Sequence, residues 1–198
     1  MITLYHHPMT RSQRFLFLLE ELEAPYQVKE VALRNRDGTG ETDPANPHPH
    51  GKTPAIDDDG VVVFESAAIA LYLTDKFPKN GIGPLVGDRL RGPYVSWLAY
   101  YCGVMEPAWT MRLLNLQTPR GSAGWPTAEE VMEFTFKTLA NGPYILGEKF
   151  SSADVLIGTT FAMFMGGPTL PKTPLLEAYV KRVVERPAYA RAMAKAGD

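Results

Sequence analysis

The stretch from residue 53 to residue 66 reads Thr-Pro-Ala-Ile-Asp-Asp-Asp-Gly-Val-Val-Val-Phe-Glu-Ser, and the fold can be worked out from it. Two short apolar runs, residues 54–56 and 61–64, flank an Asp-Gly pair, which is a strong signal for a β-hairpin. Residues 65–77 are rich in alanine and stop before Pro78, so they predict a helix that follows the second strand directly. The stretch and its continuation therefore predict a ββα unit.

The residues before this stretch predict a βαβ unit. Residues 2–5 form a short, partly β-branched run that ends at His-His-Pro, which predicts a first strand followed by a loop. From Arg11 the apolar residues recur at helical spacing until Pro25, and residues 26–33 alternate as a second strand does. Two strands joined through a helix favour parallel pairing. We therefore expect a complete small α/β domain over residues 1–78.

The rest of the chain predicts helices only. Residues 79–88 are dense in glycine and proline and are typical of a linker. Residues 89–198 then form a second, all-helical domain, whose first helix is expected to bend near Gly103 or Pro107. The expected helices span residues 89–116, 127–140, 151–165 and 174–185, with a short last piece that begins at Pro187.

Composition excludes several classes of function. The net charge of −2 gives no electrostatic reason to expect nucleic acid or an anionic membrane as partner. The apolar runs are too short to span a bilayer, and the N-terminus has no signal-peptide pattern, so we expect a cytoplasmic protein. A single cysteine, Cys102, excludes an internal disulfide and a CxxC redox centre. His6 and His7 lack metal-ligand spacing with any carboxylate cluster, so no metal site is expected.

Four motifs carry a resemblance to a known family. They are His-Gly-Lys-Thr-Pro-Ala-Ile at 50–56, Phe-Glu-Ser-Ala-Ala-Ile at 64–69, Phe-Ser-Ser-Ala-Asp-Val at 150–155 and Glu-Arg-Pro-Ala-Tyr at 185–189. On these motifs the chain resembles the cytosolic glutathione transferases, above all bacterial members near the theta and beta classes, nearly from end to end. The resemblance implies a thioredoxin-like N-terminal domain followed by an all-α C-terminal domain. It gives the last two motifs structural roles, with Ser151 and Asp154 as a helix capping box.

The first two motifs imply the glutathione contacts. In the family, the residue before a cis proline presents its backbone to the cysteinyl part of glutathione, which assigns this role to Thr53 and Pro54. Because that contact is main-chain, the Thr53 side chain, where valine is usual, is expected to matter little. Ser66 at a helix start would bind the γ-glutamyl carboxylate, Glu65 would meet its ammonium, and Lys52 would meet the glycyl carboxylate. Simple helix capping is the alternative for Glu65 and Ser66.

Catalysis requires a donor for the sulfur of glutathione, because the thiolate is the nucleophile and the thiol is mostly protonated at neutral pH. Lowering the thiol pKa by about two units takes about 2.7 kcal/mol. A hydroxyl that donates to the anion supplies roughly 1.5–3 kcal/mol, and the N-terminus of a helix adds about 0.3–1 kcal/mol. We therefore expect the donor in the loop between the first strand and the first helix, residues 6–14.

The resemblance orders the candidates in this loop. Thr-Arg-Ser-Gln-Arg at residues 10–14 is similar to the bacterial Ser-Arg-Ser-Gln-Arg pattern and places Thr10 where the catalytic serine hydroxyl stands. Ser12 is the second candidate. Tyr5 is the third, because other classes use a tyrosine at the end of the first strand. His7 and a bare backbone N–H are further alternatives.

The family places a hydrophobic electrophile between the first loop and the long helix that begins the second domain. The residues expected to line its pocket are Met9, Tyr101, Met105, Trp109 and Arg112. The alternative is that the residues on the long helix pack in an interhelical core or at a dimer surface. The resemblance further implies a homodimer, glutathione as a co-substrate and no tightly bound cofactor.

Three functions fit these expectations to different degrees. The first is a detoxifying transferase that joins glutathione to hydrophobic electrophiles, or uses it in peroxide or dehalogenation chemistry. The second is a non-catalytic binding or regulatory protein of the same fold, which the retained Glu-Ser pair and loop hydroxyl disfavour. The third is a glutaredoxin-like thiol reductase, which the absence of cysteine from the first loop disfavours.

Overall fold

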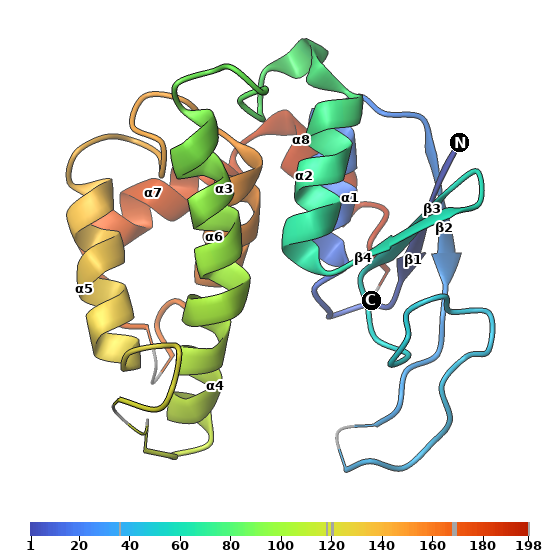
Figure 1. Ribbon diagram of the computed structural model, residues 1–198, viewed down its shortest axis with the longest axis horizontal. Helices are drawn as coiled ribbons and strands as arrows, with labels where there is room; N and C mark the ends of the chain where they lie inside the picture. The colour runs from blue at the N-terminus through green and yellow to red at the C-terminus, as the bar shows by residue number, and fades with distance from the viewer. Residues whose placement is uncertain (36, 118, 120, 168–169, 198) are drawn as a thin grey trace. The chain divides into compact units, whose positions relative to one another are not determined.

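The computed structural model describes residues 1–35, 37–117, 119, 121–167 and 170–197. Contacts divide these residues into two compact units. The first unit runs from Met1 to Asn80 and also includes the C-terminal stretch that begins at Arg186. The second unit contains the described residues between Gly81 and Glu185. Figure 1 shows the chain and its elements.

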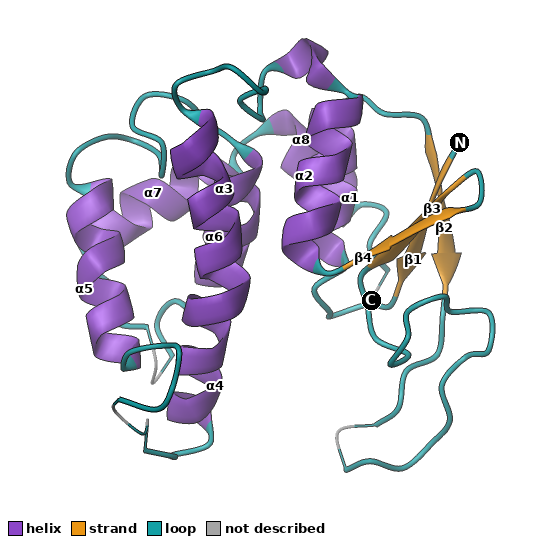
Figure 2. Cartoon of the chain, in the orientation of Figure 1, coloured by secondary structure: helices purple, strands orange, loops and turns teal. Residues whose placement is uncertain are grey.

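The first unit contains a four-stranded sheet in the order β2-β1-β3-β4 (Figure 2). The strands are β1 (Ile2–His6), β2 (Tyr26–Glu30), β3 (Ala55–Asp58) and β4 (Val61–Phe64). β1 pairs in parallel with β2 and antiparallel with β3, and β3 pairs with β4 as a hairpin. The parallel pair and the hairpin confirm the prediction from sequence.

Helix α1 forms the centre of the first unit. It spans Gln13–Glu21 and contacts β1, α2 (Ser66–Lys76) and α8 (Pro187–Met193). Because it has neighbours on several sides, every residue from Phe15 to Leu19 is fully buried, beyond the single apolar face that helical spacing indicates. A 3₁₀ turn, Pro78–Asn80, ends this part of the chain after α2.

The position of α8 corrects the predicted division of the chain into domains. The sequence assigned residues 89–198 to the second domain, but the segment from Arg186 onward belongs to the first unit. Arg186 donates two hydrogen bonds to the Glu21 carboxylate, at 2.5 and 2.8 Å, and Arg191 donates to Glu20 at 2.8 Å. These pairs join residues more than 160 positions apart, so no local pattern in the sequence could reveal them.

The second unit is helical. Its helices are α3 (Arg91–Tyr100), α4 (Glu106–Leu113), α5 (Ala128–Leu139), α6 (Ser152–Phe164) and α7 (Pro174–Val184). A π-helical turn, Tyr101–Met105, lies between α3 and α4 and contains Gly103, where the sequence predicted an irregularity. α6 packs closely on α7, because a side chain at Gly158 would approach Val183 to 2.7 Å.

The predicted capping box begins α6. The Asp154 carboxylate accepts hydrogen bonds from the backbone N–H of Ser151 at 2.9 Å and from the Ser151 hydroxyl at 3.1 Å. It also accepts from the Ile145 N–H at 2.8 Å and the Tyr179 hydroxyl at 3.0 Å. The bonds to Tyr179 and Ile145 join the start of α6 to α7 and to the preceding loop. Asp154 itself is completely buried. No helix in the described part of the chain is long and apolar enough to cross a membrane.

Candidate active site

The loop between β1 and α1 places Thr10 just before the helix. Met9 has a φ of 58° and turns the chain, after which the Thr10 carbonyl accepts the N–H of Gln13 at 3.2 Å. The Ser12 carbonyl accepts the N–H groups of Phe15 and Leu16. The helix therefore begins at Gln13, two residues later than the pattern in the sequence suggested.

The Thr10 hydroxyl is partly buried and has several partners. It donates to the His7 carbonyl at 2.7 Å. Its oxygen also lies 2.8 Å from the Ser12 hydroxyl oxygen and 3.0 Å from that of Thr53. A hydroxyl carries one hydrogen, so Thr10 can donate to only one partner at a time and accepts from the others. A new acceptor placed beside Thr10 would compete for that hydrogen.

The other candidate donors are more enclosed. Ser12 has no exposed surface, and its hydroxyl lies 2.7 Å from His6 Nδ1 and accepts the His7 N–H at 3.2 Å. Tyr5 is buried in β1, packed with Val31 and Ala55. Burial, together with the nearby Asp57, raises the pKa of Tyr5. Among the three ranked hydroxyls, Thr10 is therefore the only one that is not buried.

The two histidines of the loop are tied to the backbone. His7 Nδ1 lies 2.9 Å from the Val31 carbonyl, and His6 Nε2 lies 2.8 Å from the Ala196 carbonyl. His6 is 3% exposed and was weighed in the sequence only as a metal ligand. The sequence carries no signal for its contact with Ala196, because 190 positions separate the two residues. In the described residues, no group of three or more His, Cys, Asp or Glu side chains could hold a metal ion.

The peptide bond between Thr53 and Pro54 is cis, as the resemblance implied. The preceding loop is held by Asn46, which donates to the Lys52 carbonyl at 3.0 Å. It turns at Gly51, where φ is 57° and a side chain would approach Thr42 to 2.4 Å. The Thr53 hydroxyl lies 3.0 Å from that of Thr10, a side-chain contact that the sequence did not predict.

Helix α2 begins at Ser66, which is buried, directly after the exposed Glu65. Its first backbone hydrogen bond runs from the Ile69 N–H to the Glu65 carbonyl, so the N–H groups of Ser66 and the next two residues precede it. Glu65 makes no side-chain capping bond within the described residues. Its φ of 72° lies in the left-handed region, where a non-glycine residue costs on the order of 1–3 kcal/mol. Such strain is characteristic of ligand-binding positions.

Comparison with known proteins identifies the family. Residues 1–75 match the family described as "Glutathione S-transferase, N-terminal domain", and residues 124–187 match "Glutathione S-transferase, C-terminal domain". Glutathione S-transferase 3 of Schizosaccharomyces pombe is 30% identical over an alignment of 173 residues, and the match covers 78% of this chain and 70% of the relative. The chain belongs to the glutathione S-transferase family.

The matches to two further proteins cover almost the whole of this chain. The disulfide-bond oxidoreductase YfcG of Escherichia coli is 28% identical over 215 residues, covering 99% of this chain and 96% of the relative. The crystal structure of a glutathione transferase from Methylococcus capsulatus superposes with a TM-score of 0.79 at 25% identity, covering 100% of this chain and 99% of the other. These relatives show a bacterial glutathione transferase fold with both domains.

The expected electrophile pocket stays a prediction, because it requires residues from both units. Tyr101 and Met105 have no exposed surface, and Trp109 is 5% exposed, with its ring 5.5 Å from that of Phe161. These three residues therefore pack within the helical unit, as the alternative from sequence described. Arg112 forms an ion pair with Glu129, and Met9 is exposed.

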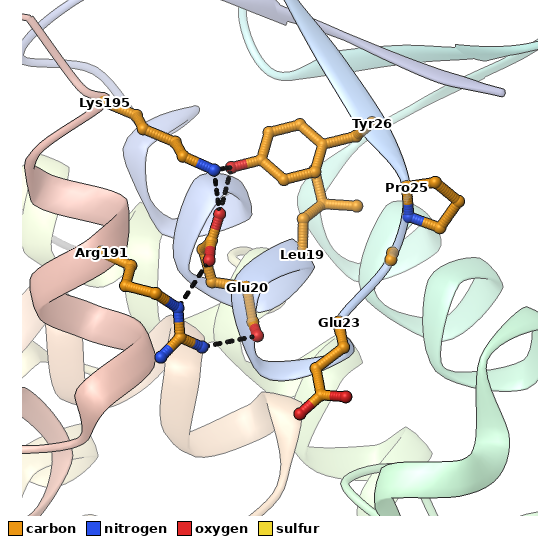
Figure 3. A pocket seen from close by; sticks show the side chains of 8 residues that line it. Leu19, Glu20, Glu23, Pro25, Tyr26, Arg191 and Lys195 are labelled. Carbon is orange, nitrogen blue, oxygen red and sulfur yellow. Dashed lines mark hydrogen bonds and ion pairs between the residues drawn. The ribbon is translucent and has the colours of Figure 1, made fainter.

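An open cavity of about 600 Å³ lies at the opposite end of α1 from Thr10. Its lining residues are Leu19, Glu20, Glu23, Ala24, Pro25, Tyr26, Arg191 and Lys195. Figure 3 shows that Lys195, Tyr26 and Arg191 all point toward Glu20. Burial alone would raise the pKa of Glu20, but hydrogen bonds from these three residues lower it to about 2. The sequence did not predict this cluster, which fastens the C-terminal segment to α1.

Proposed function

We propose that this chain is an enzyme that activates the thiol of glutathione for attack on hydrophobic electrophiles. Membership of the family supports glutathione as the co-substrate. The observation that carries the proposal is the position of the Thr10 hydroxyl, which is partly exposed at the start of α1 and 3.0 Å from the Thr53 hydroxyl. Thr53 precedes the cis proline, so a sulfur bound along its backbone would lie within reach of Thr10.

Each of the three residues of glutathione would be held by the first unit. Thr53 would pair its main chain with the cysteinyl residue, as an added strand edge does. Ser66 and the first N–H groups of α2 would bind the γ-glutamyl carboxylate, because a helix start favours an anion. The Glu65 carboxylate, whose side chain is largely exposed, would bind the γ-glutamyl ammonium. Lys52, exposed beside Thr53, would meet the glycyl carboxylate.

The chemical step requires Thr10 to turn its hydrogen from the His7 carbonyl to the bound sulfur. That hydrogen bond to an anion is worth about 1.5–3 kcal/mol, which corresponds to roughly one to two units of thiol pKa. The thiolate then attacks the electrophile, and the leaving group departs with its electron pair.

A second function is supported by a specific relative. The name of YfcG describes a disulfide-bond oxidoreductase, and the match covers nearly all of both chains. Reduction of a disulfide by bound glutathione uses the same thiolate and needs no cysteine from the protein. Two parallel assays, one with a mixed disulfide and one with an activated aryl halide as the substrate, separate the two reactions. A protein that binds glutathione and turns over neither substrate would be a binding or regulatory protein.

The decisive test is an ultraviolet titration of the bound thiol in the wild type, Thr10→Val and Thr10→Ser. We expect the wild-type thiol pKa to lie about two units below that of free glutathione, and Thr10→Val to raise it by about one to two units. Thr10→Ser keeps the donor and serves as the matched control. An unchanged thiol pKa in Thr10→Val would remove Thr10 from the mechanism.

The oligomeric state and the location of the protein are parts of the same proposal. The family resemblance implies a homodimer, and sedimentation of the purified chain tests it. A sedimentation coefficient that fits one chain at all concentrations would exclude the dimer. A cytoplasmic location is proposed with it and is tested by fractionation of the cells that produce the protein.

A further inference from the structure

We infer that His6 accepts the proton that leaves the glutathione thiol, through a relay formed by the hydroxyls of Thr10 and Ser12. This inference rests on the proposed function, because it requires the sulfur to lie beside Thr10. It adds a proton acceptor to the site and gives Ser12 a role other than that of a second donor.

The relay is continuous in the structure. His6 Nδ1 lies 2.7 Å from the Ser12 hydroxyl oxygen, which lies 2.8 Å from the Thr10 hydroxyl oxygen. Both distances are those of normal hydrogen bonds. His6 and Ser12 are buried, whereas Thr10 is partly exposed. The three groups therefore connect an enclosed imidazole to the hydroxyl that would face the sulfur.

The far side of His6 determines which way the hydrogens point. His6 Nε2 lies 2.8 Å from the Ala196 carbonyl, and a carbonyl can only accept a hydrogen bond. In the neutral ring, Nε2 therefore carries the hydrogen and Nδ1 accepts one from Ser12. The Ser12 oxygen then accepts from the His7 N–H at 3.2 Å, and it accepts from Thr10 when the single Thr10 hydrogen turns to it from the His7 carbonyl.

This arrangement conflicts with a Thr10 that donates to sulfur. While Ser12 donates to His6, a Thr10 hydrogen that points to the His7 carbonyl or to the sulfur leaves two oxygens 2.8 Å apart without a hydrogen between them. Ser12 can donate to Thr10 only if His6 Nδ1 donates to Ser12. The His6 ring must then carry hydrogens on both nitrogens, because Nε2 still donates to the Ala196 carbonyl.

With the Thr10 hydrogen turned to Ser12, one proton shift leaves a hydrogen between each pair of neighbouring groups in the relay. The thiol hydrogen passes to the Thr10 oxygen, the Thr10 hydrogen passes to Ser12, and the Ser12 hydrogen passes to His6 Nδ1. Each hydroxyl loses one hydrogen and gains one, so the net change breaks the S–H bond and forms an N–H bond. The products are a thiolate and an imidazolium, and no oxidant or reductant takes part. All hydrogens of the relay now point toward the sulfur.

The surroundings of His6 fit an acceptor that is neutral before glutathione binds. Burial lowers the pKa of His6, and His7 acts in the same direction, whereas the Ala196 carbonyl and Glu30 oppose them. Glu30 lies opposite His6 in the neighbouring strand β2. A thiolate at the end of the relay adds a negative charge that favours the imidazolium.

The C-terminal segment holds the carbonyl that fixes the His6 ring. Lys195, the residue before Ala196, and Arg191 both pair with Glu20, as Figure 3 shows. The next residue, Gly197, lies so close to Pro8 of the catalytic loop that a side chain at this position would approach the proline ring to 3.3 Å. Ala196 therefore lies between a residue that is paired with Glu20 and a residue that lies beside Pro8.

The test counts the protons released when glutathione binds. Binding is followed at neutral pH in weakly buffered indicator solution, while ultraviolet absorbance measures the thiolate formed. S-methylglutathione has no thiol, so the protons released when it binds come from other groups. This number of protons is subtracted. We expect the wild type to release far less than one proton per thiolate, because His6 retains it.

The Ser12→Ala variant breaks the relay and leaves Thr10 in place. We expect its release to rise to one proton per thiolate, and its thiol pKa to rise as well. Thr74→Val is the matched control, since it also removes a buried hydroxyl of the first unit, one that donates to the Ala70 carbonyl at 2.9 Å and is not part of the relay. It should release as few protons per thiolate as the wild type does.

Nitrogen-15 NMR of the histidine rings gives an independent readout. The free protein should show His6 as the neutral ring with hydrogen on Nε2, and the glutathione complex should show an imidazolium in the wild type only. Substitution of the other three histidines, His7, His48 and His50, one at a time by glutamine assigns the His6 signals.

The outcomes separate the two proposals. Release of a full proton per thiolate by the wild type, or a neutral His6 in a complex that contains thiolate, would overturn the relay and leave the transferase proposal standing. A wild type that binds no glutathione, or binds it without thiolate, would overturn both.

Discussion

The two units of the molecule each contain a buried polar network, and the two networks are built differently. In the first unit, Thr10, Ser12 and His6 are joined by groups that can each donate or accept. In the second unit, the Asp154 carboxylate accepts four hydrogen bonds, which three residues donate. The first network ends at a partly exposed hydroxyl, whereas the second is closed.

This difference separates a network that can react from one that stabilises. The hydroxyl hydrogens of the first network can reverse their direction, and its outer hydroxyl, on Thr10, is partly exposed. The groups around Asp154 all donate to its carboxylate. Loss of this buried acceptor would leave several donors unsatisfied. We therefore expect substitutions in the second network to change stability and substitutions in the first to change thiol chemistry.

The largest effect should come from Asp154→Ala. It removes the acceptor of four hydrogen bonds at a site with no exposed surface, so the free energy of unfolding should fall by about 3–5 kcal/mol. Urea unfolding followed by circular dichroism measures this change. A loss below about 1 kcal/mol would show that the closed network contributes no more than an ordinary cap.

A smaller effect is expected at Glu20, which fastens the C-terminal segment to the first unit. Its pKa is about 2 in the folded chain and 4.5 in the reference state, so the folded carboxylate is the stronger acid. Its contribution to stability is therefore present above pH 4.5 and is lost as the pH falls toward about 2. Glu20→Gln should lose on the order of 2 kcal/mol at neutral pH.

The pH dependence distinguishes this role from a simple packing defect. Unfolding midpoints of the wild type should fall between pH 4.5 and 2 more steeply than those of Glu20→Gln. Parallel curves for the two proteins over this range would contradict the assignment of the low pKa to Glu20.

Thr127→Ala tests the capping box of α5, which is the exposed counterpart of the one at Asp154. The Thr127 hydroxyl accepts the Glu130 N–H at 3.3 Å, and Glu130 accepts the Thr127 N–H at 2.9 Å. Because water can replace these bonds, the variant should lose about 1 kcal/mol. A loss equal to that of Asp154→Ala would show that burial does not explain the difference between the boxes.

The smallest effect should come from Thr53→Val. It removes one hydroxyl that contacts Thr10 at 3.0 Å but keeps the shape of the side chain and the backbone that follows it. We expect the thiol pKa to change by less than about half a unit, which is below 0.7 kcal/mol. An ultraviolet titration shows the change, and an effect as large as that of Thr10→Val would make the two hydroxyls equal parts of the site.

Local signals in the sequence predicted most of the elements. The hairpin is set by Asp59 and Gly60, whose φ angles of 51° and 93° are those that an Asp-Gly turn adopts. The capping box at Ser151 and Asp154 has the fixed spacing of a helix start, so it too could be recognised. Both features depend on residues that are at most three positions apart.

The sequence by itself determined the strands, the helices, the family motifs and the choice of Thr10 as first candidate, because each follows from short spacing or a contiguous pattern. Only the tertiary structure decided that residues after Arg186 join the first unit, that Thr53 contacts Thr10, and that Ala196 fixes the ring of His6. These contacts bring together residues 43 to 190 positions apart. Their partners are selected by the folded chain, since no periodicity or motif connects such distant residues.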